Sequence, residues 1–232
     1  MLTATRLDDG SLVGFVHGEN HKFPDGGYGE WNSTGVWTSQ DDGVSWIDQG
    51  EVVGCKKPDK HSFGGMALNE CLWEATNKRW LGYSGGNAFI SNDPHGLPGT
   101  WLAYYKGDFT QKVDVNGPMP PLTTSPGLEK AWVTWGGLTY NSYLKQYILT
   151  WVGGDKVRAA FSPDGIHWGP VVNLIDKATA GGEITYAFIT GETDTACAQD
   201  CNLVYMLFRG DHVKSVSGNR KDMIRRPLHF EL

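Results

Sequence analysis

Ser39-Gln40-Asp41-Asp42-Gly43-Val44-Ser45-Trp46 is the stretch of the chain that decides its fold. An Asp just before a tight turn accepts hydrogen bonds from the N–H groups of the turn itself. Gly43 supplies a backbone angle that a side chain would obstruct, and Trp46 opens the next strand with a large ring that packs between neighbouring hairpins. The stretch therefore predicts a turn between two antiparallel strands, in which Asp41 has a structural role.

Two further stretches repeat this pattern. Ser162–Trp168 reads SPDGIHW and is one residue shorter, whereas Ser91–Trp101 begins SNDPHG and is a looser, expanded version. All three fall at the turn between the third and fourth strands of a repeated segment. In a four-stranded meander this turn lies on the face opposite the usual functional site, so Asp164 is also expected to be structural.

The strand signals recur with a spacing of about fifty to sixty residues, and helix signals are nearly absent. The four segments predict strands at 2–6, 11–17, 35–38 and 46–53; at 66–75, 80–84, 88–91 and 101–105; at 131–140, 146–152, 157–161 and 168–174; and at 184–190 and 202–209, with weaker strands to 232. A meander of this kind is one blade of a β-propeller. We therefore predict an all-β chain, a single β-propeller domain over 1–232 of four-stranded antiparallel blades. Four blades are visible, at about 1–54, 61–115, 124–176 and 180–232, and a fifth is possible.

The pattern Ser-x-Asp-x-Gly-x-x-Trp resembles the Asp-box of sialidase-like propellers, a superfamily that also includes five-bladed arabinanase-like enzymes. The resemblance implies a carbohydrate as substrate or ligand. Sialidases use three arginines and a Tyr-Glu pair, but of the seven arginines here only Arg209 falls at an expected site position. Arabinanase-like enzymes place an Asp base, an Asp modulator and a Glu acid at successive inner strands. Glu129 and Glu183 fall at the starts of such inner strands, but no Asp of this chain falls at the position of the base.

Composition and charge exclude several classes of protein. The net charge is −6 and the basic residues are scattered, so the chain lacks the basic face that a nucleic-acid partner requires. No apolar run approaches the about 20 residues that span a bilayer, so no membrane partner is expected. Strand-like sequence follows Met1 directly, which leaves two alternatives, an intracellular protein or a secreted one whose signal was removed.

The cysteines favour secretion. Cys55 and Cys71 flank one loop, Cys197 and Cys201 flank another, and four cysteines allow three pairings among which the sequence cannot choose. Asn32 begins an Asn-Ser-Thr glycosylation sequon, which also favours an extracellular location. No pair of Cys-x-x-Cys or His motifs has zinc-ligand spacing, so neither a metal nor another cofactor is expected.

Site residues are expected on one face of the blades, where the first strand begins, the second ends and the third begins. In the first segment the second strand leads into His17-Gly18-Glu19-Asn20-His21, followed by a long loop through Tyr28, Glu30 and Trp31. Long loops without structure of their own are often functional. The predicted catalytic residues on this face are Glu19, Glu129, Glu183 and Asp211, and the predicted substrate-binding residues are His17, His21, Tyr28, Trp31 and Arg209.

Glycoside cleavage needs two carboxyl groups across a sugar, one protonated and one ionised. We therefore predict a secreted glycoside hydrolase, with Glu129 or Glu183 as general acid and Glu19 or Asp211 as base or nucleophile. Arg209 and His17 would bind hydroxyl or carboxylate groups. Two alternatives remain open: a polysaccharide lyase that uses His and Tyr as base and acid, and a lectin-like propeller that binds sugars without catalysis.

Overall fold

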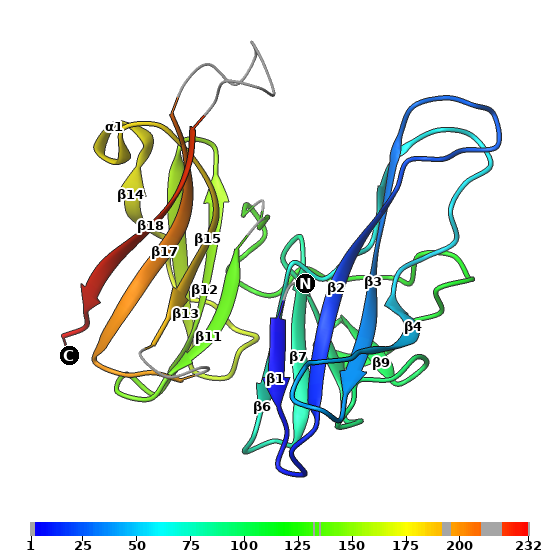
Figure 1. The fold of residues 1–232 in the computed structure, drawn as a ribbon, viewed down its shortest axis with the longest axis horizontal. Coiled ribbons are helices and arrows are strands. Elements are labelled where there is room, and N and C mark those ends of the chain that lie inside the picture. The colour runs from blue at the N-terminus through cyan, green and yellow to red at the C-terminus, as the bar shows by residue number, and fades with distance from the viewer. Residues whose placement is uncertain (1–2, 132, 135, 192–195, 210–219, 232) are drawn as a thin grey trace. The chain divides into compact units, whose positions relative to one another are not determined.

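The computed structural model describes residues 3–131, 133–134, 136–191, 196–209 and 220–231. In these ranges the chain forms four small β-sheets and one short helix, α1 (Lys177–Ala180). The prediction of an all-β chain built of propeller blades is confirmed. The chain divides into two compact units, Met1–Thr124 and Ser125–Leu232, with two sheets in each (Figure 1).

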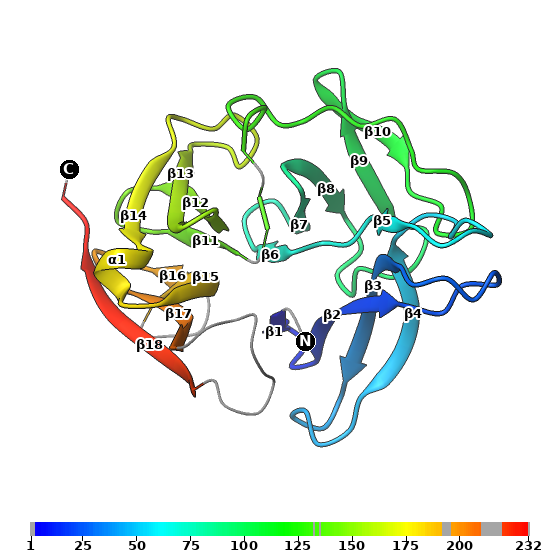
Figure 2. The same cartoon turned by 90° about the horizontal axis from the view of Figure 1, so that it is seen from above.

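The first sheet is an antiparallel meander with one added strand. Its order is β1 (Thr3–Arg6), β2 (Leu12–Asn20), β3 (Glu30–Ser39) and β4 (Ile47–Val53). The added strand β5 (Phe63–Gly65) pairs in parallel with Glu30–Asn32 at the start of β3, as Figure 2 shows. Strand β5, which precedes the second sheet in the sequence, is therefore part of the first sheet.

The β2–β3 hairpin corrects one expectation. The predicted long loop after His17 is strand at both of its ends, because β2 and β3 stay paired from Leu12 opposite Ser39 to Asn20 opposite Trp31. Only residues 21–29 remain as a loop. The hairpin is the long pair of strands that rises beyond the rest of the first unit in Figure 1.

The second sheet has a simple meander order. Its strands, from one edge to the other, are β6 (Glu70–Glu74), β7 (Arg79–Ser84), β8 (Asn87–Ser91), β9 (Trp101–Tyr105) and β10 (Asp108–Lys112). The first four correspond to the predicted strands, although β6 begins at Glu70 rather than 66, and β10 is an additional edge strand (Figure 2).

The Asp-containing turns lie between the third and fourth strands of three sheets, as predicted. Asp41 accepts hydrogen bonds from Ser39 Oγ at 2.8 Å, from the Ser45 backbone N–H at 2.8 Å and from Ser45 Oγ at 2.6 Å. The Trp46 indole N–H donates to the Gly43 carbonyl at 3.0 Å. The carboxylate of Asp41 thus stabilises its own turn.

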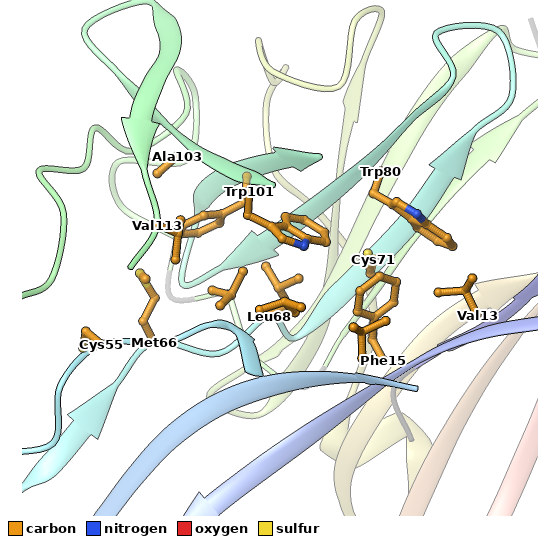
Figure 3. Close-up of a cluster of buried hydrophobic side chains, with 14 of the residues drawn as sticks. Val13, Phe15, Cys55, Met66, Leu68, Cys71, Trp80, Trp101, Ala103 and Val113 are labelled. Atoms are coloured by element: carbon orange, nitrogen blue, oxygen red, sulfur yellow. The ribbon is translucent and has the colours of Figure 1, made fainter. Parts of the chain in front are cut away.

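A shared hydrophobic core joins the two sheets of the first unit. Phe15 from β2 meets Trp80 from β7 edge to face, with ring centroids 4.8 Å apart, and meets Trp101 from β9 at 5.6 Å. All three rings are fully buried among aliphatic side chains that include Val13 and Leu68 (Figure 3). The indole N–H groups of Trp80 and Trp101 donate to backbone carbonyls in the 93–101 turn, so the apolar rings are buried without leaving their polar atoms unpaired.

The second unit contains the third and fourth sheets. The third has the order β14 (Val172–Asp176), β13 (Lys156–Ser162), β12 (Gln146–Gly153), β11 (Gly137–Asn141) and β16 (Ala196–Cys197), and the fourth has the order β15 (Glu183–Thr190), β17 (Asp200–Arg209) and β18 (Arg220–His229). Two boundaries differ from expectation: β11 begins at Gly137 rather than 131, and β14 begins at Val172 rather than Trp168. The described part of the fourth blade has three strands instead of four.

Strand β16 lies in the sequence between two strands of the fourth sheet but pairs in parallel with β11 of the third. The Asn141 side chain, which is buried, donates to the Ala198 carbonyl at 2.8 Å and so holds the same connection. Cys197 and Cys201 form a disulfide there, whereas Cys55 and Cys71 are buried free thiols. Of the two pairs that flank loops, one is therefore bridged.

Candidate functional site

The end of the β2–β3 hairpin carries a row of polar side chains on one face. His17 and Glu19 lie two apart on β2, His21 follows directly after the end of β2, and Glu19 lies directly opposite Asn32 on β3. Residues opposite one another in an antiparallel pair project to the same face, and so do residues two apart in a strand. Glu30 therefore joins the same row.

Three of these side chains form a compact cluster. Oxygen atoms of Glu19 and Glu30 and a ring nitrogen of His21 all lie within 4.8 Å of one another. His21 Nε2 lies 3.2 Å from Glu19 Oε2. Glu19 and His21 are exposed and Glu30 is half-buried, so the cluster is open to solvent and to a ligand.

The imidazole of His21 is held in a fixed orientation. Its Nδ1 lies 2.9 Å from the Gly29 carbonyl, and because a carbonyl only accepts, Nδ1 must carry the proton. This hydrogen bond, and then the hydrogen bond and charge of Glu19, raise the pKa of His21 against an opposing contribution from desolvation. The other nitrogen, Nε2, faces the carboxylate.

A second chain of hydrogen bonds positions the cluster from the side of β3. The Asn32 amide donates from Nδ2 to Glu30 Oε1 at 2.9 Å. Asn32 Oδ1 lies 3.2 Å from His17 Nε2, which in turn lies 3.5 Å from Glu19 Oε1. His17 and Asn32 thus connect the two carboxylates through side chains of fixed position.

The tip of the hairpin is tied to the segment that precedes β5. Asp25 Oδ2 accepts from the His61 backbone N–H at 3.0 Å and from His61 Nδ1 at 2.9 Å. Lys57 donates to Asn20 Oδ1 at 3.2 Å and lies over the Phe23 ring. These contacts hold the loop 21–29 that carries His21 and Tyr28.

Exposed aromatic rings lie beside the cluster. Tyr28, 73% exposed, stacks on His21 with centroids 6.2 Å apart and an interplanar angle of 8°. Phe63 on β5 is 65% exposed and meets Tyr28 edge to face at 5.7 Å. Trp31, also predicted to bind substrate, donates its indole N–H to the Cys55 carbonyl at 3.0 Å and packs against the core of the first unit.

A groove of about 470 Å³ runs along the same end of the hairpin. It is lined by residues of β2, β3 and β4 and of the loop that follows β2: Gly18, Glu19, Asn20, His21, Lys22, Ser33 and Glu51. Ser33 Oγ donates to Glu51 Oε1 at 3.0 Å, and Ser33, which lies opposite Gly18, is on the other face of the hairpin from Glu19 and Asn32. Glu19 and His21 are the members of the cluster that reach the groove.

The other predicted catalytic residues belong to the second unit. Glu129 is exposed and accepts from the Gly127 backbone N–H at 3.1 Å, so it stabilises its own turn. Glu183, the first residue of β15, is ion-paired with Lys177. Asp211 and the side chain of Arg209 lie outside the described residues. A shared role of these four residues with Glu19 in one site therefore remains a prediction.

From the sequence, Glu30 was predicted to lie in a loop, and Asn32 was assigned no role other than the first residue of the glycosylation sequon. The signal that identifies them is the alternation of polar residues on both sides of the turn, at 17, 19 and 21 and again at 30 and 32. Alternation with a period of two indicates paired strands with one polar face. The segment was nevertheless predicted as a loop, because it is rich in Gly and lacks the β-branched residues that are typical of strands.

Comparison with known proteins shows similarity in structure only. No family model and no curated protein sequence matches the chain. An N-acetylgalactosamine deacetylase from F. plautii, solved in complex with blood group B trisaccharide, matches 98% of this chain and 71% of its own with a TM-score of 0.56 and 13% identity. A protein of unknown function from Dyadobacter fermentans matches 98% of this chain and 52% of its own with a TM-score of 0.50 and 12% identity.

An α-L-arabinanase from Penicillium chrysogenum in complex with arabinobiose gives a TM-score of 0.48 at 14% identity, over 97% of this chain and 61% of that one. The chain thus spans about half the length of the Dyadobacter protein, 52%, and about three fifths of the arabinanase, 61%. Among the described residues no helix is long and apolar enough to cross a membrane. At these identities the likeness concerns architecture, and it shows that this chain has a β-propeller fold.

Proposed function

We propose that this chain is a carbohydrate hydrolase whose reaction centre is the cluster of Glu19, His21 and Glu30. The observation that carries the proposal is the closeness of two carboxylates, whose oxygens lie within 4.8 Å. Glycosidases use two carboxyl groups, which lie about 5–5.5 Å apart in retaining enzymes and about 6.5–9.5 Å apart in inverting ones. The short separation of Glu19 and Glu30 fits a retaining glycoside hydrolase.

The surroundings of the two carboxylates suggest different roles. Glu30 is half-buried and accepts a hydrogen bond from the Asn32 amide, which holds its carboxyl group in one orientation and suits a nucleophile. Glu19 is exposed at the groove, where it can reach the oxygen of a leaving group. In the proposed reaction Glu30 attacks the anomeric carbon while Glu19 protonates the departing oxygen, and Glu19 then deprotonates the water that releases the sugar from Glu30.

The exposed rings of Tyr28 and Phe63 support a sugar as substrate. Apolar faces of sugar rings pack well on aromatic side chains, and Tyr28 lies next to the cluster through its stacking on His21. The F. plautii deacetylase, which has the same fold, is a sugar-modifying enzyme that was solved with a bound trisaccharide. The disulfide between Cys197 and Cys201 supports an extracellular location, since disulfides persist in oxidising compartments.

A second candidate function is carbohydrate binding without catalysis. It is favoured by the exposure of Tyr28 and Phe63, which is unusual for large apolar rings and typical of a binding surface. In that case Glu19 and Glu30 would only accept hydrogen bonds from sugar hydroxyls. Their replacement by Gln would then leave glycan binding largely intact.

The test is to incubate the chelator-treated protein with a panel of plant, algal and microbial polysaccharides that includes N-acetylated glycans. New reducing ends, lost in Glu30→Gln, are the expected result. Three other results would contradict glycoside hydrolysis: release of acetate alone, formation of a product with a new carbon–carbon double bond, and glycan binding that yields no product and persists in the Glu19→Gln and Glu30→Gln variants.

A further inference from the structure

The cluster on the β2–β3 hairpin has the donor atoms of a metal site. It offers one imidazole nitrogen from His21 and carboxylate oxygens from Glu19 and Glu30, all within 4.8 Å of one another. Imidazole with carboxylate is a ligand set used for divalent transition ions, whereas magnesium and calcium are bound by oxygen alone. The mixture of donors therefore distinguishes this cluster from an ordinary acidic surface.

The facing atoms of His21 and Glu19 can share either a proton or a metal ion. Because Nδ1 of His21 donates to the Gly29 carbonyl at 2.9 Å, a neutral ring presents the lone pair of Nε2 to the carboxylate. Nε2 and Glu19 Oε2 are 3.2 Å apart, and two facing acceptors repel unless a proton or a cation lies between them. The second carboxylate, Glu30, adds to the negative charge at the same point.

The groups behind the three donors are those that orient metal ligands. A ligating histidine usually donates its other N–H to a carbonyl or carboxylate, as His21 does to Gly29. Ligating carboxylates are themselves hydrogen-bonded, as Glu30 is by the Asn32 amide at 2.9 Å. Asn32 is in turn positioned by His17 at 3.2 Å. The donors are thus held in place by the backbone and side chains of both strands.

We propose that Glu19, His21 and Glu30 bind a divalent transition-metal ion of the zinc class. Three protein ligands leave at least one coordination position for water or for a ligand hydroxyl, which the exposure of the cluster allows. His17 is a positioning residue in this site, because it acts through Asn32.

This site does not rest on the proposed function, since it is argued from the donor atoms alone. It does affect that function. A bound ion takes both carboxylates as ligands, so Glu30 is no longer free as a nucleophile and Glu19 is no longer free to transfer a proton. Zn²⁺ is therefore expected to inhibit glycoside hydrolysis by the carboxylate pair, and a chelator to restore it.

The test is calorimetric titration of the untagged, chelator-treated protein with ZnCl₂, MnCl₂, CaCl₂ and MgCl₂. The expected result is one Zn²⁺ per chain, bound more tightly than Ca²⁺ or Mg²⁺. Loss of a ligand in His21→Gln or Glu30→Gln should weaken Zn²⁺ binding by about 100-fold or more, since even supporting residues contribute about 10–100-fold. His229→Gln is the matched control, because His229 is also paired with a carboxylate, Asp200 at 2.7 Å, but lies outside the cluster.

The proposal is overturned if the folded wild-type protein binds no Zn²⁺, if Ca²⁺ binds as tightly, or if His21→Gln and Glu30→Gln bind as well as the control. Circular dichroism of each variant establishes that it is folded before titration. Failure of the ion site leaves the hydrolase proposal standing. Conversely, activity that requires Zn²⁺ would refute the ion-free carboxylate mechanism and leave the ion site intact.

Discussion

His61 and Asp25 are joined twice, because the backbone N–H and the Nδ1 of His61 lie 3.0 and 2.9 Å from the same oxygen, Asp25 Oδ2. These two hydrogen bonds, together with one from the Gly27 backbone N–H, lower the pKa of Asp25 to about 2. The folded-state pKa is depressed, so the stabilising contribution is present above the ordinary pKa of 3.8 and is lost as the pH falls through about 2.

We therefore expect Asp25→Asn to loosen the hairpin tip at neutral pH and to have less effect in strong acid, where Asp25 is itself protonated. Hydrogen exchange of the amides in residues 21–29 should become several-fold faster, because local opening reports the loss of local hydrogen bonds. Asp59→Asn, at an exposed position in the same segment as His61, is the control and should leave these rates unchanged. Equal rates in the two variants at neutral pH would show that the tip does not depend on Asp25.

Replacement of the carboxylates should separate catalysis from folding. Glu19→Gln is expected to lower kcat by about 10²–10⁴-fold, the usual contribution of a positioned acid or base, and Glu30→Gln, which removes the nucleophile, by at least as much. The thermal midpoint should change little, since both side chains reach solvent. Glu231→Gln, an exposed residue far along the chain, is the control for the loss of one negative charge. Activity retained in Glu30→Gln would exclude it as nucleophile.

A side chain at position 27 should displace the hairpin tip. A Cβ built on Gly27 would lie 2.1 Å from Nδ1 of His61, which is far closer than any real contact. We expect Gly27→Ala to break the Asp25–His61 contact and to destabilise the protein by about 1–3 kcal/mol. Gly35→Ala, whose Cβ meets only the Gly50 carbonyl at 3.5 Å, should cost much less in chemical denaturation. The reverse order would contradict the observed packing.

The Asp164 turn should contribute to stability and not to activity. Asp164 accepts from Ser162 Oγ at 3.0 Å, from the Ile166 and His167 backbone N–H groups at 2.9 and 2.8 Å, and from His167 Nδ1 at 2.7 Å. Asp164→Ala removes these acceptors and should cost about 1–2 kcal/mol in urea unfolding, with kcat unchanged. Asp155→Ala, at an exposed turn, is the comparison. Loss of activity at full stability would mean that the turn contributes to the reaction.

The two free thiols, Cys55 and Cys71, should not react with a thiol reagent in the native protein. Burial raises the pKa of Cys55, and burial raises that of Cys71 well above its ordinary value, so neither forms the reactive thiolate at neutral pH. A thiol reagent should therefore react with two groups in denaturant and with none in buffer. Rapid native labelling of Cys71 would contradict its burial.

Local signals were enough to predict the blades. The turn from Ser39 to Trp46 and the two similar turns lie between the strands where the sequence predicted them. Such a turn is stabilised by its own side chains, so its formation depends little on the rest of the chain. The strands β5, β10 and β16 were missed. Strands β5 and β16 are short and pair with distant residues, such as Phe63 with Glu30 and Ala196 with Tyr140, which no local pattern encodes. Strand β10 forms a tight hairpin with β9, in which Asp108 pairs with Tyr105.

The site was predicted in part. His17, Glu19 and His21 were placed at the end of the second strand because a polar run there interrupts an apolar strand. Glu30 was not recognised as their partner, since its position depends on the register that pairs Asn20 with Trp31. A one-residue shift in that register would turn Glu30 to the other face, and the sequence alone does not fix it.

The pairing of β16 with β11 has a consequence for how this protein can be divided. A segment that belongs to one blade by sequence completes the neighbouring blade in space, and the Cys197–Cys201 bond is located in that shared segment. A shortened gene that stops after residue 190 would leave the buried Asn141 facing water and an unprotected sheet edge beside it. Engineers who wish to recombine the blades of this chain should therefore keep β16 and the Cys197–Cys201 segment together with the third blade, although this segment belongs to the fourth blade by sequence.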